Sequence, residues 1–179
     1  MITLPNLLTL LRLAGAPVVI VLYHADVRAA GWGAAAVWIA MMLSDVLDGM
    51  VARRLGQSST LGVYLDPVVD KITVLMLFYA LALDEVFSVW LPHAILAREF
   101  LHSAVRDAAA SRGDVVGANW MGKVKASLQT VLITWALLMP VWAAADRGAA
   151  ALRLCAWAML ALAWAFTAAF AWRNRRFVL

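Results

Sequence analysis

Apolar residues fill the chain in runs of about 20 residues, which is the helix length that crosses the hydrocarbon layer of a bilayer. Short polar segments separate the runs. The pattern predicts an all-α integral membrane protein, with six transmembrane helices preceded by a short interfacial amphipathic helix. The interfacial helix is expected at about residues 3–11, and the spans at about 11–24, 30–53, 60–83, 87–110, 120–143 and 150–172. Because these elements use nearly every residue, residues 1–179 are expected to form one membrane domain.

The first apolar run admits two interpretations. Leu4, Leu7, Leu8 and Leu11 form an apolar stripe after Pro5, which favours an interfacial helix that leads into the first span. A secretory signal peptide is the alternative, because the run continues to residue 23. A signal peptide carries basic residues before its apolar run, and this segment offers only Arg12. We therefore favour the interfacial helix.

Four aspartates interrupt the apolar pattern between residues 45 and 70. Asp45 and Asp48 share one face of the second expected span, and Asp66 and Asp70 share one face of the third. A turn at residues 56–59 joins the two spans, so all four carboxylates can point into one small volume. Each acid near mid-membrane costs roughly 3 kcal/mol, so four unpaired acids would cost on the order of 10 kcal/mol. The pattern therefore predicts cations among them.

The chemistry of this cluster points to hard metal ions. Carboxylate oxygens without His or Cys suit Mg²⁺, Mn²⁺ or Ca²⁺, and two such ions about 3.5–4 Å apart stabilise displacement at phosphorus. The neighbouring residues agree with a phosphate ligand. Gly49, Ala52 and Gly62 leave room on the acidic faces, and Arg53 can bind a phosphate through two hydrogen bonds.

Basic residues form a second unusual pattern in the fourth span. Arg98, His102 and Arg106 recur every four residues, and Glu99 and Asp107 lie beside them. We interpret Arg98 and Arg106 as binding the phosphate of an anionic acceptor; a helix end that projects into the interface is the alternative. His102 is expected to be a packed histidine.

Three lysines also lie near the expected site. Lys123 and Lys125 point to opposite sides of the fifth span, so at most one faces the site, and we favour Lys123. Lys71, beside Asp70, suits a substrate contact or a side chain that reaches to the interface equally well.

Composition and charge placement agree with a membrane enzyme. The chain is 65% hydrophobic and 15% charged, which excludes a soluble domain of appreciable size, and its single cysteine excludes an intramolecular disulfide. With the amino terminus in the cytoplasm, three basic residues fall outside: Arg28, Arg147 and Arg153. Twelve fall on the cytoplasmic side: Arg12, Arg53, Arg54, Lys71, Arg98, Arg106, Arg112, Lys123, Lys125, Arg173, Arg175 and Arg176. This bias predicts a multi-pass protein of the inner (cytoplasmic) membrane whose site faces the cytoplasm, and no nucleic-acid partner.

The acidic stretch resembles a known family. Its pattern is Asp45-x2-Asp48-Gly49-x2-Ala52-Arg53-x8-Gly62-x3-Asp66-x3-Asp70, the signature of the CDP-alcohol phosphatidyltransferases. The resemblance implies six transmembrane helices in membrane lipid, a homodimer, and two divalent metal ions, Mg²⁺ or Mn²⁺, held by the first three aspartates with Asp70 beside them. It implies that Asp70 deprotonates the acceptor hydroxyl, which attacks a CDP-lipid and releases CMP. It also implies a CDP-lipid site at Gly49, Ala52, Arg53 and Gly62.

Further matches concern the acceptor. Residues 5–17, 65–71, 97–106 and 122–125 are similar to the branch of this family that uses sn-glycerol 3-phosphate, with Ser44 and Asp107 as mild departures. That likeness implies transfer of a phosphatidyl group from CDP-diacylglycerol to sn-glycerol 3-phosphate, giving phosphatidylglycerophosphate. The alternatives are the same chemistry on phosphatidylglycerol (a cardiolipin synthase) or on an inositol phosphate. A cation-coupled transporter is a remote alternative, disfavoured because paired halves with interrupted helices are not evident.

Overall fold

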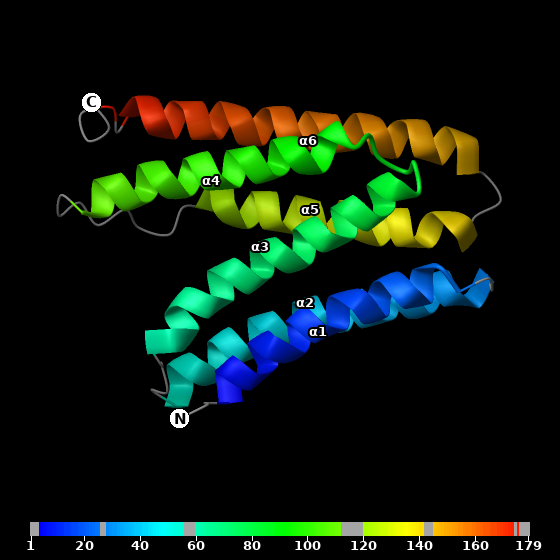
Figure 1. Ribbon diagram of the computed structural model, residues 1–179, viewed down its shortest axis with the longest axis horizontal. Coiled ribbons are helices and arrows are strands. Elements are labelled where there is room, and N and C mark those ends of the chain that lie inside the picture. The colour runs from blue at the N-terminus through cyan, green and yellow to red at the C-terminus, as the bar shows by residue number, and fades with distance from the viewer. Residues whose placement is uncertain are drawn as a thin grey trace.

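Six α-helices make up the fold in the computed structural model, which describes residues 4–25, 28–55, 60–111, 120–141, 145–173 and 175 (Figure 1). The helices are α1 (Leu4–Tyr23), α2 (Arg28–Leu55), α3 (Thr60–Leu83), α4 (Trp90–Ala110), α5 (Trp120–Leu138) and α6 (Ala145–Arg173), with a 3₁₀ turn η1 (Met139–Val141) after α5. Within these ranges there is no strand, so the prediction of an all-α chain is confirmed. The expected interfacial helix and first span form one continuous helix, α1.

Local sequence explains where several helices begin and end. Pro5 falls in the first turn of α1, where its missing N–H is not needed. Pro140 cannot continue α5, and the chain tightens into η1 after Leu138.

The end of α3 is a Schellman motif. The N–H of Val86 bonds to the carbonyl of Leu81, and that of Glu85 to the carbonyl of Ala82. Glu85 adopts a left-handed conformation (φ 59°), a position usually taken by glycine. Arg153 of α6 donates to the carbonyls of Glu85 (2.7 Å) and Val86 (2.9 Å), so this turn is fastened to α6.

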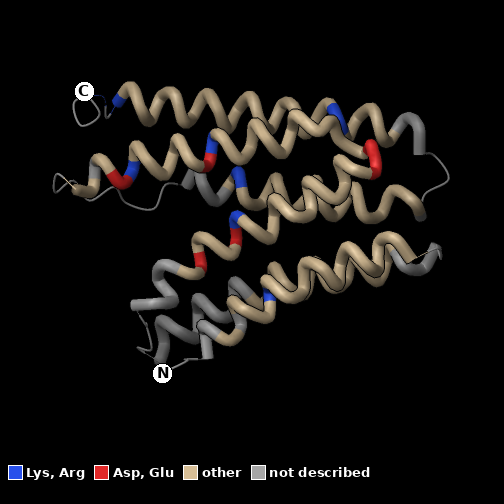
Figure 2. The backbone as a smooth tube through the Cα atoms, in the orientation of Figure 1, with Lys and Arg blue, Asp and Glu red and all other residues tan. Residues whose placement is uncertain are grey.

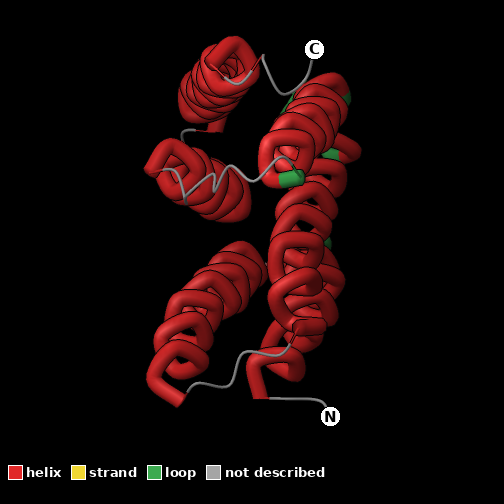
Figure 3. Tube along the Cα trace, turned by 90° about the vertical axis from the view of Figure 1, so that its left-hand side faces the viewer, coloured by secondary structure: helices red, strands yellow, loops and turns green. Residues whose placement is uncertain are grey.

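The helices lie in two rows of three, seen almost end-on in Figure 3. Contacts order one row as α1, α3, α4 and the other as α2, α5, α6, with α1 against α2 and α4 against α6 between the rows. Helix α3 crosses the bundle diagonally, and the start of α1 lies at the same end of the molecule as the end of α6 (Figure 1). Trp38, Phe78 and Ile133 are fully buried at the centre.

The outer surface is largely apolar. Leu83, Val21 and Trp90 are 83%, 70% and 71% exposed, an arrangement that suits contact with lipid rather than water. By length and composition one stretch of the described chain, Gly148–Arg173, is apolar enough to cross a membrane, and only 28% of its apolar window is buried. Shorter apolar stretches occupy Thr9–Tyr23, Gly31–Ser44 and Val124–Leu138. The six-span arrangement therefore stays a prediction.

Candidate active site

Two of the four aspartates have described side chains, and both contact α1. Asp66 and Asp70 lie one turn apart on α3. Thr9 donates its hydroxyl hydrogen to Asp66 Oδ1, and Nη1 of Arg12 donates to Asp70 Oδ1. Thr9 and Arg12 are each only 2% exposed, whereas the Asp70 side chain is 47% exposed. One carboxylate oxygen of Asp70 is therefore bonded to α1, while the rest of the side chain stays accessible.

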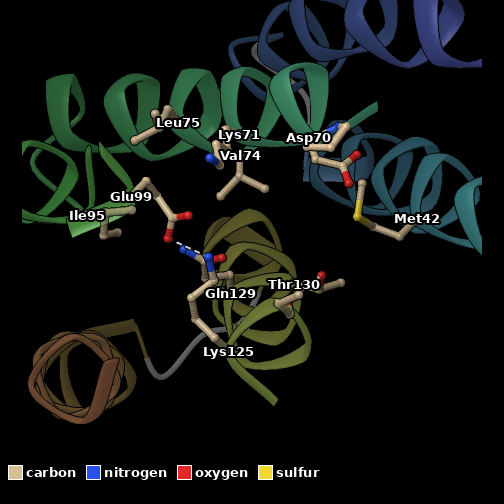
Figure 4. Close-up of a pocket in the computed structure, with 12 residues that line it drawn as sticks. Met42, Asp70, Lys71, Val74, Leu75, Ile95, Glu99, Lys125, Gln129 and Thr130 are labelled. Carbon is tan, nitrogen blue, oxygen red and sulfur yellow. Dashed lines mark hydrogen bonds and ion pairs between the residues drawn. The ribbon is translucent and has the colours of Figure 1, made fainter. Parts of the chain in front are cut away.

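A cavity of about 250 Å³ lies in front of Asp70 (Figure 4). Helices α2, α3, α4 and α5 enclose it with Met42, Pro67, Asp70, Lys71, Val74, Leu75, Ile95, Glu99, Lys125, Ala126, Gln129 and Thr130. Figure 4 shows Asp70 directed toward Met42 of α2, and the Glu99 carboxylate directed toward Lys125 and Gln129 of α5. Asp70 therefore lies on one side of the cavity, and Glu99 with Lys125 and Gln129 lies on the other.

A buried ionic cluster forms that second side. Oε1 of Glu99 accepts hydrogen bonds from Lys125 Nζ (2.5 Å) and Arg98 Nη1 (2.8 Å), and the three side chains are 9%, 17% and 8% exposed respectively. Lys71 Nζ donates to the hydroxyl of Ser103 at 2.6 Å. Glu99 is therefore bonded to two cations, and Lys71 adds a further positive charge to the cavity wall, which suits an anionic ligand.

The basic residues predicted from α4 separate in space. Arg98 is buried, with Nε directed at the carbonyl of Ala163 in α6 (3.4 Å), and it is not among the described residues that line the cavity. Arg106 is 49% exposed and pairs with Asp107 at 3.6 Å. The His102 ring packs against Phe170, with centroids 4.9 Å apart, as expected for a packed histidine.

Sequence reasoning missed three contacts of the site. Lys125 lines the cavity, although the alternation of the two lysines gave no reason to prefer it over Lys123. Thr9 entered the prediction only within the family likeness of residues 5–17, and Arg12 only there and as a basic residue on the cytoplasmic side. Their three-residue spacing, with two polar residues on an otherwise apolar face, was the available signal.

The remaining predicted site residues lie outside the described side chains. These are Asp45, Asp48, Gly49, Ala52 and Arg53 in α2, Gly62 in α3 and Lys123 in α5. Among the side chains that are described, no group of three His, Cys, Asp or Glu could hold a metal ion. Because Asp45 and Asp48 are not among them, the four-aspartate metal site stays a prediction.

A second, outer cavity of about 520 Å³ lies between α3 and α4. It is lined by Val68, Lys71, Ile72, Leu75, Leu96, Glu99, Phe100, Ser103, Ala104 and Asp107. Lys71, Leu75 and Glu99 line both cavities, so these three side chains lie between them.

Most of the described charged residues lie in the half of the bundle where α1 begins and α6 ends (Figure 2). Within the described chain, the opposite end carries Asp84, which pairs with His24, and Arg153, which donates to the carbonyls of Glu85 and Val86 in the turn after α3. The cavity with its acid and its cations thus belongs to the charged half of an otherwise apolar helical bundle.

An apolar helical bundle with spaced aspartates and cations on its cavity wall agrees with the enzyme of phosphate esters expected from the sequence. A family model of the CDP-alcohol phosphatidyltransferases matches residues 2–170, and the chain belongs to this family. It is 36% identical over 145 residues to the CDP-diacylglycerol–glycerol-3-phosphate 3-phosphatidyltransferase of Escherichia coli (strain K12), covering 78% of this chain and 79% of the relative. The same figures hold for enzymes of that name from Shigella flexneri serotype 5b (strain 8401) and Shigella sonnei (strain Ss046). The family expected from the aspartate signature is confirmed.

Proposed function

We propose that this enzyme transfers the phosphatidyl group of CDP-diacylglycerol to sn-glycerol 3-phosphate, giving phosphatidylglycerophosphate and CMP. The names of the relatives support both substrates. One structural observation carries the proposal to particular residues: a single cavity brings Asp70 together with Lys71 and Lys125. A small acceptor with a reacting primary hydroxyl and a phosphate needs a base for the hydroxyl and cations for the phosphate, and the cavity offers both.

Asp70 is the proposed general base. It takes the proton of the acceptor's primary hydroxyl, and the oxygen attacks the phosphorus that carries the diacylglycerol. A new P–O bond forms, the P–O bond to the nucleotide breaks, and CMP leaves with the electron pair. The 47% exposure of Asp70 and its place on the cavity wall support this role.

Two divalent ions, Mg²⁺ or Mn²⁺, are proposed to be held by Asp45, Asp48, Asp66 and Asp70. The donor set fits such ions, because Asp66 and Asp70 offer carboxylate oxygens one turn apart on α3. Asp45 follows Met42 by three positions in α2, the spacing of one helix face, and Met42 lines the cavity with Asp70. When bound, the ions stabilise negative charge on the phosphate oxygens and on the leaving nucleotide.

The acceptor phosphate is proposed to bind Lys71 and Lys125, with Gln129 beside them. Of the cations predicted from the sequence, Arg98 is already bonded to Glu99 and Ala163, and Arg106 lies outside in a pair with Asp107. Arg98 then supports the site indirectly, because it shares the charge of Glu99 and leaves Lys125 donors for a ligand. Arg106 and Lys123 remain proposed contacts nearer the cytoplasm.

The donor site and the setting of the enzyme are proposed from the family signature and the charge pattern. Gly49, Ala52, Arg53 and Gly62 are proposed to bind CDP-diacylglycerol. The chain is proposed to cross the inner membrane six times, with the charged end in the cytoplasm, and to form a homodimer in membrane lipid. Cross-linking in native membranes tests the dimer, and reporter fusions at the carboxyl terminus test the orientation.

An acceptor assay tests the function. The enzyme purified in detergent is given CDP-diacylglycerol, Mn²⁺ and one acceptor at a time, and CMP release is followed. We expect release with sn-glycerol 3-phosphate. Release with phosphatidylglycerol or an inositol phosphate but not with glycerol 3-phosphate would replace the proposed acceptor, and absence of CMP with every acceptor would refute the proposed chemistry.

A further inference from the structure

Helix α1 contacts both described aspartates in matching register. Thr9 and Arg12 are three residues apart on α1, and Asp66 and Asp70 are four residues apart on α3. Each residue of the first pair donates to one residue of the second. The two helices pack against each other, so the two hydrogen bonds lie side by side across one interface. The function proposed above gives no role to Thr9 or Arg12.

The burial of Arg12 indicates that this contact matters energetically. Removing a guanidinium from water costs several kcal/mol unless a well-placed anion compensates it. Arginine can also extend toward an interface when its charge is not needed inside. Here the side chain is 2% exposed and is directed instead at Asp70, the acid that lines the cavity.

We propose that Thr9 and Arg12 form a clasp that orients the carboxylates of Asp66 and Asp70 for catalysis. Arg12 is a positioning residue for Asp70, and Thr9 is one for Asp66. The inference rests on the proposed function, in which Asp70 accepts a proton and both acids bind metal. Arg12 bonds Oδ1 of Asp70 and so limits the movement of a carboxylate that otherwise stands 47% exposed at the cavity wall. It also supplies positive charge to the acids before metal arrives.

Positioning predicts a particular kinetic pattern. An angstrom of misplacement at a reacting group can cost about 100-fold in rate, so kcat of Arg12→Gln should fall by about 100-fold. The acceptor KM should stay nearly unchanged, because Arg12 does not line the acceptor cavity. Arg12→Lys should recover part of kcat, since lysine keeps the charge but loses the planar donor group. Thr9→Val should lower kcat less, because it removes a neutral donor.

The chain offers matched controls. Arg153→Gln removes an arginine that bonds only backbone carbonyls of the distant α3 turn in the described contacts. Thr134→Val removes a hydroxyl that donates to the carbonyl of Thr130 within α5. Both controls should keep the wild-type kcat.

A second measurement needs no turnover. The melting temperature of the full chain in detergent is followed by tryptophan fluorescence, with and without Mn²⁺. Without metal, Arg12→Gln should have a lower melting temperature than the wild type, because Asp70 loses the positive charge of Arg12. Added Mn²⁺ should raise its melting temperature more than that of the wild type, because the ions supply the missing charge.

The outcomes separate the possibilities. An unchanged kcat, or a lower kcat with the same Mn²⁺-dependent rise as the wild type, would make Arg12 a purely structural residue and overturn the clasp. If Arg12→Gln does not fold, unchanged kcat in both Arg12→Lys and Thr9→Val overturns it. If the wild type releases no CMP while the melting results are as expected, the proposed function fails and the clasp stands.

Discussion

Lys125 gives the sharpest test of the acceptor site. Lys125→Met keeps the length of the side chain and removes its charge. In the structure the ammonium group bonds Glu99 at 2.5 Å and lines the cavity opposite Asp70. Glu99 keeps its bond to Arg98 at 2.8 Å in the variant, so its carboxylate does not become an isolated buried charge and the fold should survive.

The size of the effect follows from the chemistry of the contact. An ammonium group has three donors, so Lys125 can bond Glu99 and a phosphate together. A hydrogen bond to a charged group contributes about 1.5–3 kcal/mol, and each 1.4 kcal/mol is a factor of ten in affinity. The KM for sn-glycerol 3-phosphate should therefore rise about 10- to 100-fold, because this interaction is made with the bound ground state and the transition state alike. The kcat and the KM for CDP-diacylglycerol should change little.

Initial rates of CMP release, with one substrate varied and the other saturating, measure the effect. Two other proposed acceptor contacts give the comparison. Lys123→Met removes the lysine two positions away on α5, and Arg106→Ala removes a side chain that is 49% exposed and pairs with Asp107 at 3.6 Å, so both should raise the acceptor KM less than Lys125→Met does. A larger rise in acceptor KM for Lys123→Met than for Lys125→Met would refute our assignment of the phosphate site.

Three further predictions test other parts of the molecule. Asp70→Asn should abolish CMP release and leave CDP-diacylglycerol binding largely intact; equal loss of both would deny Asp70 the role of base. A chelator should stop CMP release and Mn²⁺ should restore it, whereas release that persists in chelator would contradict the metal site. His24, in the turn after α1, has a raised pKa chiefly because it bonds the Ile20 carbonyl; burial lowers the pKa by less, and Asp84 adds to the rise. A raised folded-state pKa means that its stabilising contribution is complete below pH 6.5 and is lost as pH rises through that pKa, so the melting-temperature difference between wild type and His24→Gln should shrink above pH 6.5.

The helices were predictable because the apolar runs that define them are long. The third span was expected at 60–83, and α3 has those bounds. The first run was divided into two elements at Leu11, but the structure contains one helix, because no residue between the apolar stripe and Pro17 interrupts the backbone bonds of α1. The fifth run was expected to reach residue 143, whereas Pro140 ends regular α-helix at Leu138.

The site was less predictable, because helical spacing fixes which residues share a face and leaves open what that face meets. Arg98 and Arg106 share a spacing, yet one is buried against Glu99 and the other is half exposed. Lys123 and Lys125 face opposite ways, and only the rotation of α5 decides which one reaches the cavity. Arg12 and Asp70 are 58 positions apart, so no local pattern could have paired them.

The two cavities are separated by a partition that is one layer of side chains thick. Lys71, Leu75 and Glu99 have surface on both sides of it. Side-chain size at these three positions therefore decides whether the bundle holds two cavities or one continuous passage from the outer cavity between α3 and α4 to the cavity in front of Asp70. An enzyme that joins a lipid-soluble substrate to a water-soluble one would have the border between the two environments at these three side chains.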